Sequence, residues 1–218
     1  MVAMSFLRPT RRQAASPRKT LNLTTRSQVL GLLAIALLTL VIVRIWAAAV
    51  WPIALSVDEA QYLVWSRDLQ MGYYSKPPFV AWILSAATLA CGSGSGTDLF
   101  GLEGCVRWLQ PLAMGGAAVF VYATAQALFN RTQIAIWAAV LFLLAPLAAF
   151  YSQAATTDAW LLLWWSAALW AFIKAIGPSK ELGSGLRLGS DLTGMTHQTQ
   201  LIWWVACGVF AGLGLLTK

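Results

Sequence analysis

Long apolar runs dominate this chain, and they constrain its fold more than any other feature. Residues 29–55, 105–129, 133–150 and 160–176 form four such runs, and residues 201–216 form a shorter fifth. A helix needs roughly 20 apolar residues to cross about 30 Å of hydrocarbon. Charged residues make up 11% of the chain, against roughly 25% in soluble domains. We therefore predict an all-α polytopic membrane protein with about five spans.

The basic charge is concentrated before the first apolar run. The residues there are Arg8, Arg11, Arg12, Arg18, Lys19 and Arg26, in a chain with a formal net charge of +7. Basic residues beside a span usually mark its cytoplasmic side. We therefore predict that residues 1–27 are a basic cytoplasmic tail and not a nucleic-acid-binding segment. Residues 28–218 are then the transmembrane part.

The segment 77–91 decides the topology. Its apolar core of about 15 residues is shorter than an ordinary span and typical of an interfacial or re-entrant helix. If it does not span, ten basic residues lie on the cytoplasmic side and four on the other; if it spans, the numbers are eight and six. The positive-inside rule favours the first arrangement. That arrangement gathers several charged residues on one extracytoplasmic face: Asp58, Glu59, Lys76, Arg107, Asp158 and Lys218.

Residues 58–70 are predicted to form a second interfacial helix, directly after the first span. Asp58, Tyr62 and Trp65 are spaced i, i+4 and i+7 and so share one helix face. Tyr and Trp prefer the headgroup level of a bilayer. We expect Gly72 to end this helix.

Two adjacent carboxylates, Asp58 and Glu59, open that helix. Ionised groups beside hydrocarbon are costly and are usually functional. Either carboxylate can act as a general base if its position and pKa suit the reaction, and spacing alone does not choose between them. The alternative is that Asp58 is the N-cap of the helix, because Asp is a favoured capping residue.

Other charged residues each have a functional and a structural interpretation. Lys76 lies in an aromatic-rich turn, where its ammonium suits a lipid phosphate, but it could equally contact anionic headgroups unspecifically. Asp158 follows two threonines before an apolar run, which is an ordinary helix-start signal. Arg107 and Lys218 could simply anchor helix ends at the interface.

The three cysteines lack metal-ligand spacing. Cys91 and Cys105 flank one loop and can pair if that loop is extracytoplasmic. Cys207 lies in an apolar run and is expected to be a small packing residue.

The motifs, taken in order, resemble the polyprenyl-phosphate-sugar-dependent glycosyltransferases of the GT-C fold. The similarity is strongest to the group that holds the protein O-mannosyltransferases and the aminoarabinose transferase that modifies lipid A. It rests on Asp58-Glu59-Ala60-x-Tyr62 and Gly72-Tyr73-Tyr74-x-Lys76-Pro77-Pro78 after one span, and continues through Arg107, Thr157-Asp158-Ala159 and residues 212–218. It covers about residues 28–218, nearly the whole chain.

The resemblance implies a GT-C-type transmembrane helical core with an extracytoplasmic juxtamembrane helix loop after the first span. It implies a sugar donor on a polyprenyl or dolichyl phosphate, an acceptor that is a protein, a lipid or a glycan, and inversion at the anomeric carbon. It places the enzyme in the plasma (inner) membrane, with its active site outside the cytoplasm. Members of the family typically exceed twice this length, so we expect the chain to be the N-terminal catalytic-core portion of one.

The resemblance also assigns roles to residues. The position matching Asp58 is the general base; beside it, we add Glu59 as a second catalytic candidate. Lys76 and Lys218 match lysines that hold the lipid phosphate. We add Arg107, Tyr62 and Tyr74 to the predicted donor-binding set and Asp158 as a supporting acid.

Two alternatives remain open at this stage. We predict no metal or other cofactor, but Asp58, Glu59 and Asp158 could together bind a divalent cation through oxygen ligands. The competing function is a non-catalytic lipid-binding or transporter subunit. A transporter is expected to hold ionisable residues near the bilayer midplane, whereas here they lie at the ends of spans, with Arg44 the exception.

Overall fold

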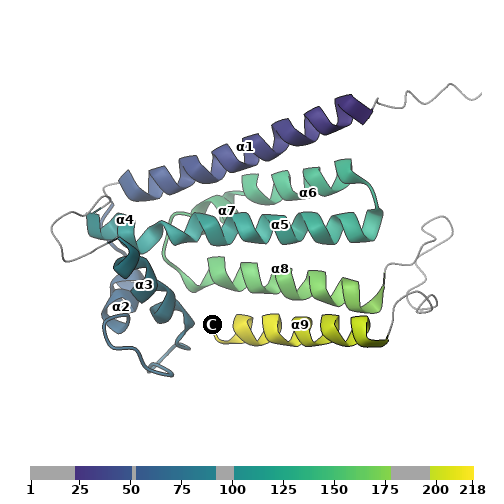
Figure 1. Ribbon diagram of the computed structural model, residues 1–218. Helices are drawn as coiled ribbons and strands as arrows, with labels where there is room; N and C mark the ends of the chain where they lie inside the picture. The colour runs from purple at the N-terminus through teal and green to yellow at the C-terminus, as the bar shows by residue number, and fades with distance from the viewer. Residues whose placement is uncertain (1–22, 51–52, 92–100, 178–196) are drawn as a thin grey trace, which may run out of the picture.

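The computed structural model describes residues 23–50, 53–91, 101–177 and 197–218, and every regular element in these ranges is an α-helix (Figure 1). This confirms the prediction of an all-α fold. The helices are α1 Leu23–Val50, α2 Val57–Trp65, α3 Phe79–Ala90, α4 Gly101–Arg107, α5 Leu109–Phe129, α6 Thr132–Leu144, α7 Pro146–Tyr151, α8 Thr157–Ile176 and α9 His197–Leu215. Residues 1–22 of the predicted tail lie outside the described residues, and residues 23–27 already belong to α1.

The long helices form a bundle in which α8 packs between α5 and α9, and α5 also packs against α6 (Figure 1). Among the described residues, three segments are long and apolar enough to cross a membrane: Gly101–Phe129, Thr157–Ile176 and Gln198–Leu215. The apolar segments Ala34–Val50 and Thr132–Leu144 are shorter. The described bundle is therefore that of an integral membrane protein, with three of the predicted spans at full length.

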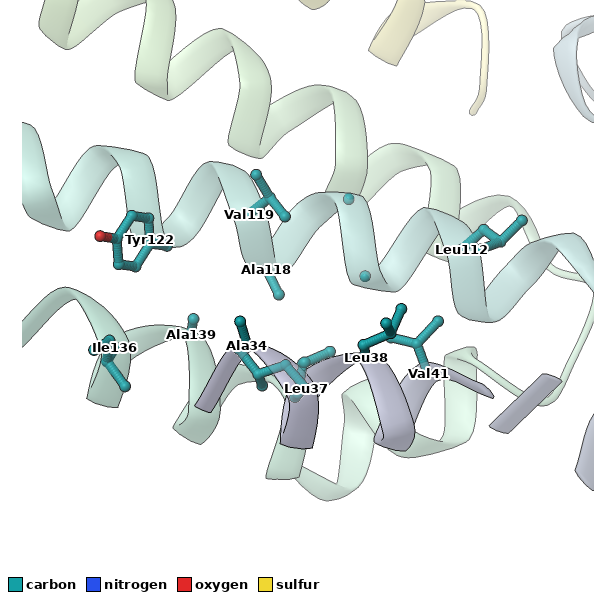
Figure 2. Close-up of a pocket in the computed structure, with 13 residues that line it drawn as sticks. Ala34, Leu37, Leu38, Val41, Leu112, Ala118, Val119, Tyr122, Ile136 and Ala139 are labelled. Carbon is teal, nitrogen blue, oxygen red and sulfur yellow. The ribbon is translucent and has the colours of Figure 1, made fainter. Parts of the chain in front are cut away.

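An apolar groove runs along one side of this bundle, between α1, α5 and α6 (Figure 2). Small residues on α5 let the helices approach closely here. A Cβ built on Gly115 would lie 3.2 Å from Cγ2 of Val41 on α1, which is closer than an ordinary van der Waals contact. Glycine at this position therefore sets the spacing between α1 and α5.

The apolar run over residues 133–150 is not one continuous helix, because the structure breaks it into two helices. The helix α6 ends at Leu144, and α7 begins at Pro146. Proline has no N–H to donate and its ring clashes with the preceding turn. The residue before it, Ala145, accordingly leaves the helical region, with φ −58° and ψ 133°.

Arg44 compensates for this break from the neighbouring helix. Its guanidinium Nη2 donates a hydrogen bond to the carbonyl of Leu143, in the last turn of α6. The last carbonyls of a helix lack partners within the helix, and a positive charge is favourable at that end of the helix dipole. Arg44, the ionisable residue that the sequence places inside a predicted span, therefore faces α6.

The short helices α2, α3 and α4 gather at one end of the bundle, beside the start of α8 and the C-terminal end of α9 (Figure 1). The helix predicted over residues 58–70 is shorter than expected, since α2 ends at Trp65 rather than near Gly72. The reason is Tyr73, whose ring stacks on Trp65 at 4.8 Å between centroids. Its hydroxyl lies 2.9 Å from the Trp65 carbonyl, to which it can donate.

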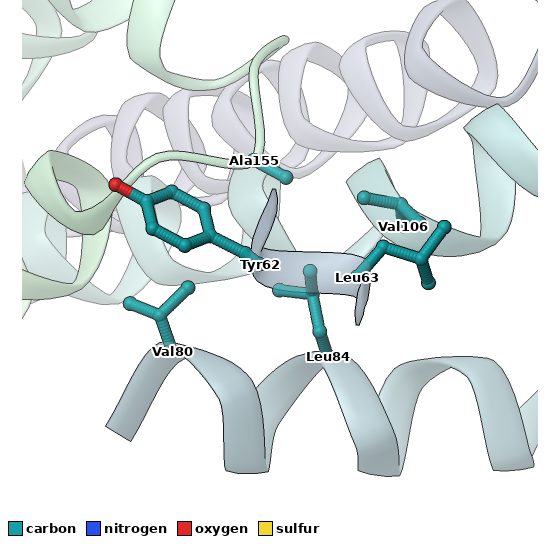
Figure 3. Close-up of a cluster of buried hydrophobic side chains, with 6 residues drawn as sticks. All are labelled: Tyr62, Leu63, Val80, Leu84, Val106 and Ala155. Atoms are coloured by element: carbon teal, nitrogen blue, oxygen red, sulfur yellow. The ribbon is translucent and has the colours of Figure 1, made fainter. Parts of the chain in front are cut away.

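A buried apolar cluster joins α2 to α3 and α4. It contains Tyr62, Leu63, Val80, Leu84, Val106 and Ala155 (Figure 3). The helix α3 has 12 residues, which at 1.5 Å per residue is too short to cross about 30 Å of hydrocarbon. Its location at the membrane interface stays a prediction.

Candidate active site at one end of the bundle

Glu59 forms the centre of the polar network at this end of the bundle, and it is 1% exposed. Both of its carboxylate oxygens accept from Arg107: Nε donates to Oε1 at 2.8 Å and Nη2 to Oε2 at 2.7 Å. The backbone N–H of Ala155 donates to Oε1 at 2.8 Å, and that of Ser56 to Oε2 at 2.9 Å. One carboxylate therefore joins α2, α4 and the segment before α8.

The rest of the Arg107 guanidinium is also occupied. Its Nη1 donates to the carbonyl of Ile53 at 2.9 Å, and Nη2 donates to that of Ala54 at 3.2 Å. Burial alone would raise the pKa of Glu59, but the hydrogen bonds from Arg107, Ala155 and Ser56 lower it to about 2. Glu59 is therefore ionised at neutral pH, and a carboxylate so stabilised is a poor proton acceptor.

Asp58 has the opposite environment. The N-cap of α2 is Ser56, whose hydroxyl accepts from the Glu59 N–H at 3.3 Å while Glu59 bonds back to the Ser56 N–H. This is a capping box, so the alternative that Asp58 caps the helix is wrong. The Asp58 side chain is exposed, and no hydrogen bond or ion pair to it is found within the described ranges. Of the two carboxylates, Asp58 is thus the one without a partner among the described residues.

Tyr62 lies within electrostatic reach of both Asp58 and Asp158. It lies one turn after Asp58 on α2, is 4% exposed, and extends from α2 toward the segment that carries Ala155 (Figure 3). Burial raises the pKa of the Tyr62 hydroxyl, and the negative charges of Asp58 and Asp158 raise it further. Both carboxylates therefore act on the same phenol, one from α2 and one from α8.

Asp158 itself is paired with Lys218. The Lys218 Nζ lies 2.8 Å from Oδ1 of Asp158, and the two side chains are 50% and 25% exposed. This hydrogen bond raises the pKa of Lys218, so its ammonium stays charged at neutral pH. The pair lies at the solvent-accessible edge of the site, in contrast to the buried pair of Glu59 and Arg107.

A backbone contact brings the segments of the two predicted phosphate-binding lysines together. The N–H of Phe79, three residues after Lys76, donates to the carbonyl of Leu216 at 3.3 Å. The Phe79 ring also packs edge-on against Trp160 and Trp164 of α8, at 5.7 and 5.8 Å between centroids. The half-buried Lys76 is thus held by its own segment near the end of α9.

The structure does not bring every predicted residue into this group. Tyr74 is fully exposed and its side chain points away from the core. Its neighbour Tyr73 makes the contacts instead, through its ring on Trp65 and its hydroxyl on the carbonyls of Trp65 and Asp68.

Sequence reasoning also missed Ser56, although Ser56-x-x-Glu59 fits the capping-box pattern. The Ala155 N–H has no sequence signal, because any residue could supply it.

The proposed cation ligands do not form one cluster. Within the part of the chain that the structure describes, no three His, Cys, Asp or Glu side chains come together as a metal site. Glu59 is bound to Arg107 and Asp158 to Lys218, so two of the three carboxylates are compensated by basic side chains.

Cys91 and Cys105 form a disulfide, with their Cα atoms 5.8 Å apart. This is the pairing that the sequence permits for an extracytoplasmic loop. The bond connects the end of α3 to α4, two residues before Arg107. Cys207 is free and half-buried on α9.

Comparison with known proteins relates the chain to membrane glycosyltransferases. Residues 75–189 match the family described as dolichyl-phosphate-mannose-protein mannosyltransferase. The chain is also similar to the lipid A galacturonosyltransferase RgtD of Rhizobium johnstonii (strain DSM 114642 / LMG 32736 / 3841), with 34% identity over 137 residues. That match covers 61% of this chain and 27% of RgtD, so the chain spans about a quarter of this curated relative. No solved structure matches the chain.

Proposed function

The chain belongs to the dolichyl-phosphate-mannose-protein mannosyltransferase family, and we propose that it carries the catalytic end of an enzyme that transfers a sugar from a polyprenyl-phosphate donor. The observation that carries this proposal is the contrast between the two adjacent carboxylates. Glu59 is buried and bound by four hydrogen bonds, whereas Asp58 is exposed beside it. A site for chemistry needs one such free base on a rigid support.

In the proposed reaction, Asp58 accepts the proton of an acceptor hydroxyl. The acceptor oxygen then attacks the anomeric carbon of the sugar, and the bond from that carbon to the phosphate oxygen breaks. The electron pair of the broken bond leaves with the polyprenyl phosphate. A single displacement of this kind inverts the anomeric carbon.

Lys76 and Lys218 are proposed to stabilise the departing phosphate. Positive groups aimed at developing negative charge are among the largest contributions to catalysis. The bond between Phe79 and Leu216 supports this role, because it holds the two lysine segments together. Lys218 is half-exposed and bound to Asp158. A phosphate could therefore replace Asp158 as the partner of the Lys218 ammonium without unfolding the site.

We propose that this end of the bundle lies outside the cytoplasm, on the outer side of the plasma (inner) membrane. The disulfide between Cys91 and Cys105 supports this orientation, since such bonds persist in oxidising compartments and are rare in the cytosol. The positive-inside rule favours the same orientation.

The acceptor proposed for the first tests is a lipid. The support is the similarity to RgtD, which is a lipid A galacturonosyltransferase. Protein and glycan acceptors, which the family name and the motifs also permit, belong in the same panel.

The test uses the whole protein in membranes, with radiolabelled sugar supplied on a panel of polyprenyl phosphates. We expect transfer by the wild type and a loss of roughly 10²-fold or more in Asp58→Asn, the range for removal of a general base. The matched control is Asp68→Asn, an exposed aspartate just beyond α2, which should retain transfer. Equal transfer by Asp58→Asn would exclude Asp58 as the base. Absence of transfer with every donor would favour the lipid-binding or transporter alternative.

A further inference from the structure

The apolar groove between α1, α5 and α6 has a volume of about 490 Å³ and lies apart from the acidic end of the bundle. Its wall on α1 includes Ala34, Leu37 and Val41, which face α5 and α6 across the groove (Figure 2). Every lining residue is apolar except for the hydroxyl of Tyr122. The groove therefore suits a hydrocarbon chain that lies along the bundle.

Arg44 lies beside the groove, bonded to the carbonyl of one of the residues that line it. Leu37, Val41, Arg44 and Ala48 are spaced i, i+4, i+7 and i+11, which puts them on one stripe of α1. The carbonyl to which Arg44 donates belongs to Leu143, which lines the groove. A guanidinium thus lies directly next to the apolar groove.

The charge of Arg44 is not neutralised by the described residues. Its side chain is 9% exposed, and its Nη1 finds no hydrogen-bond acceptor among them. The two ion pairs within the described ranges are those of Arg107 and Lys218, and Arg44 meets only a carbonyl. A buried cation without a counter-charge is strongly unfavourable, so an anion from outside the described chain would be stabilising here.

We propose that the groove binds one chain of an anionic glycerophospholipid whose phosphate pairs with Arg44. The two parts of such a lipid match the two parts of the site, with the hydrocarbon chain in the groove and the anionic headgroup at the Arg44 guanidinium beside it. Arg44 lies six residues before the end of α1, about 9 Å along the helix axis at 1.5 Å per residue. That position suits a lipid of the leaflet nearest the candidate active site. This proposal is independent of the proposed sugar transfer.

The experiment is native mass spectrometry of the whole protein in detergent, with phosphatidylglycerol and phosphatidylcholine of identical chains as the two probes. We expect one phosphatidylglycerol to be retained in preference to phosphatidylcholine. Arg44→Gln keeps an N–H donor for the Leu143 carbonyl but removes the charge, and it should retain phosphatidylglycerol roughly fivefold less well. The charge control is Lys174→Gln, because Lys174 lies over the Trp203 ring near the other end of α8. It should retain the lipid as the wild type does.

A second pair of variants tests the groove without touching Arg44. Val119 lines the groove and is 64% exposed, so Val119→Trp should fill the groove and reduce retention. The matched control is Val209→Trp on α9, at a 54% exposed position outside the groove, which should have no effect. Equal retention of the two probes, or retention unchanged by both Arg44→Gln and Val119→Trp, would overturn the proposal. Displacement of phosphatidylglycerol by an equimolar polyprenyl phosphate would overturn it too, because the groove would then belong to the sugar donor.

Discussion

Glu59 and Arg107 lie 48 residues apart in the chain and form two hydrogen bonds, at 2.7 and 2.8 Å, inside one end of the bundle. Arg107 also bonds to the carbonyls of Ile53 and Ala54, while Glu59 bonds to the Ala155 N–H. The pair therefore joins the segment that follows the first long helix to the two segments that carry Asp58 and Asp158. Glu59, which was predicted to be catalytic, thus holds in place the helix that carries Asp58, the candidate base.

Glu59→Gln is expected to destabilise the protein by about 3–5 kcal/mol, because it leaves the buried Arg107 charge without its partner. The measurement is the free energy of unfolding in detergent. Replacing both partners by apolar residues, as in Glu59→Leu with Arg107→Met, should cost less than Glu59→Gln alone, since no unpaired charge is then left.

The exposed control for this series is Asp68→Asn, which should change the free energy of unfolding by no more than about 0.5 kcal/mol. A Glu59→Gln variant as stable as this control would show that the pair contributes no stability.

The stability of the protein should also depend on pH through Glu59. Its pKa is lowered from the ordinary value of 4.5 to about 2 in the folded state. A carboxyl with a lowered pKa contributes stability that is fully present above its unfolded pKa and is lost as the pH falls through its folded pKa. Unfolding free energy should therefore fall between about pH 4.5 and pH 2, and this component should be missing in Glu59→Gln. An identical pH profile in the variant would contradict the assignment.

The sequence predicts which charged residues lie at the same end of the bundle, but not which of them contact one another. The lengths of the apolar runs and the distribution of basic residues predicted that one end of the bundle holds Asp58, Lys76, Asp158 and Lys218. In the structure, the helices and loops that carry these residues do meet at one end. Those arguments depend only on the length of helix needed to cross the bilayer and on the preference of basic residues for its cytoplasmic side. The pairing of Glu59 with Arg107 depends on how α2 packs against α4, which no local pattern encodes.

Two local signals in the sequence were available but were not used. Ser56-x-x-Glu59 is a capping-box pattern, which would have assigned Glu59 to the helix start and left Asp58 free. Pro146 lies inside the apolar run over residues 133–150, where it predicts a helix break. The early end of α2 had no such signal, since it depends on Tyr73 folding back onto Trp65.

Lys218→Gln is expected to separate function from stability. The Lys218–Asp158 pair is half-exposed, and exposed ion pairs contribute only about 0–1 kcal/mol. The variant should therefore unfold like the wild type within that range, whereas transfer from the polyprenyl-phosphate donor should fall because the phosphate loses a cation. Parallel kinetics and unfolding measurements on one preparation check both statements. Wild-type transfer by Lys218→Gln would remove Lys218 from the donor site.

The disulfide between Cys91 and Cys105 should stabilise the end of the bundle that carries Arg107. It closes a loop with a sequence separation of 14, and a loop of about 15 residues corresponds to roughly 3 kcal/mol in the chain-entropy description. The double variant Cys91→Ser with Cys105→Ser should lower the unfolding free energy by about that amount, and Cys207→Ser is the control at a free cysteine.

Maleimide labelling of the denatured, unreduced protein, isolated from membranes under thiol-blocking conditions, checks the bond and the orientation together. Of Cys91, Cys105 and Cys207, only Cys207 should react before reduction, and all of them should react after it, as read by mass spectrometry of their peptides. Since cytosolic thiols are kept reduced, labelling of Cys91 and Cys105 before reduction would place this end of the bundle in the cytoplasm and contradict the proposed orientation. Labelling of Cys207 without Cys91 and Cys105 would instead place the loop, and with it the Glu59–Arg107 pair, on the oxidising side of the membrane.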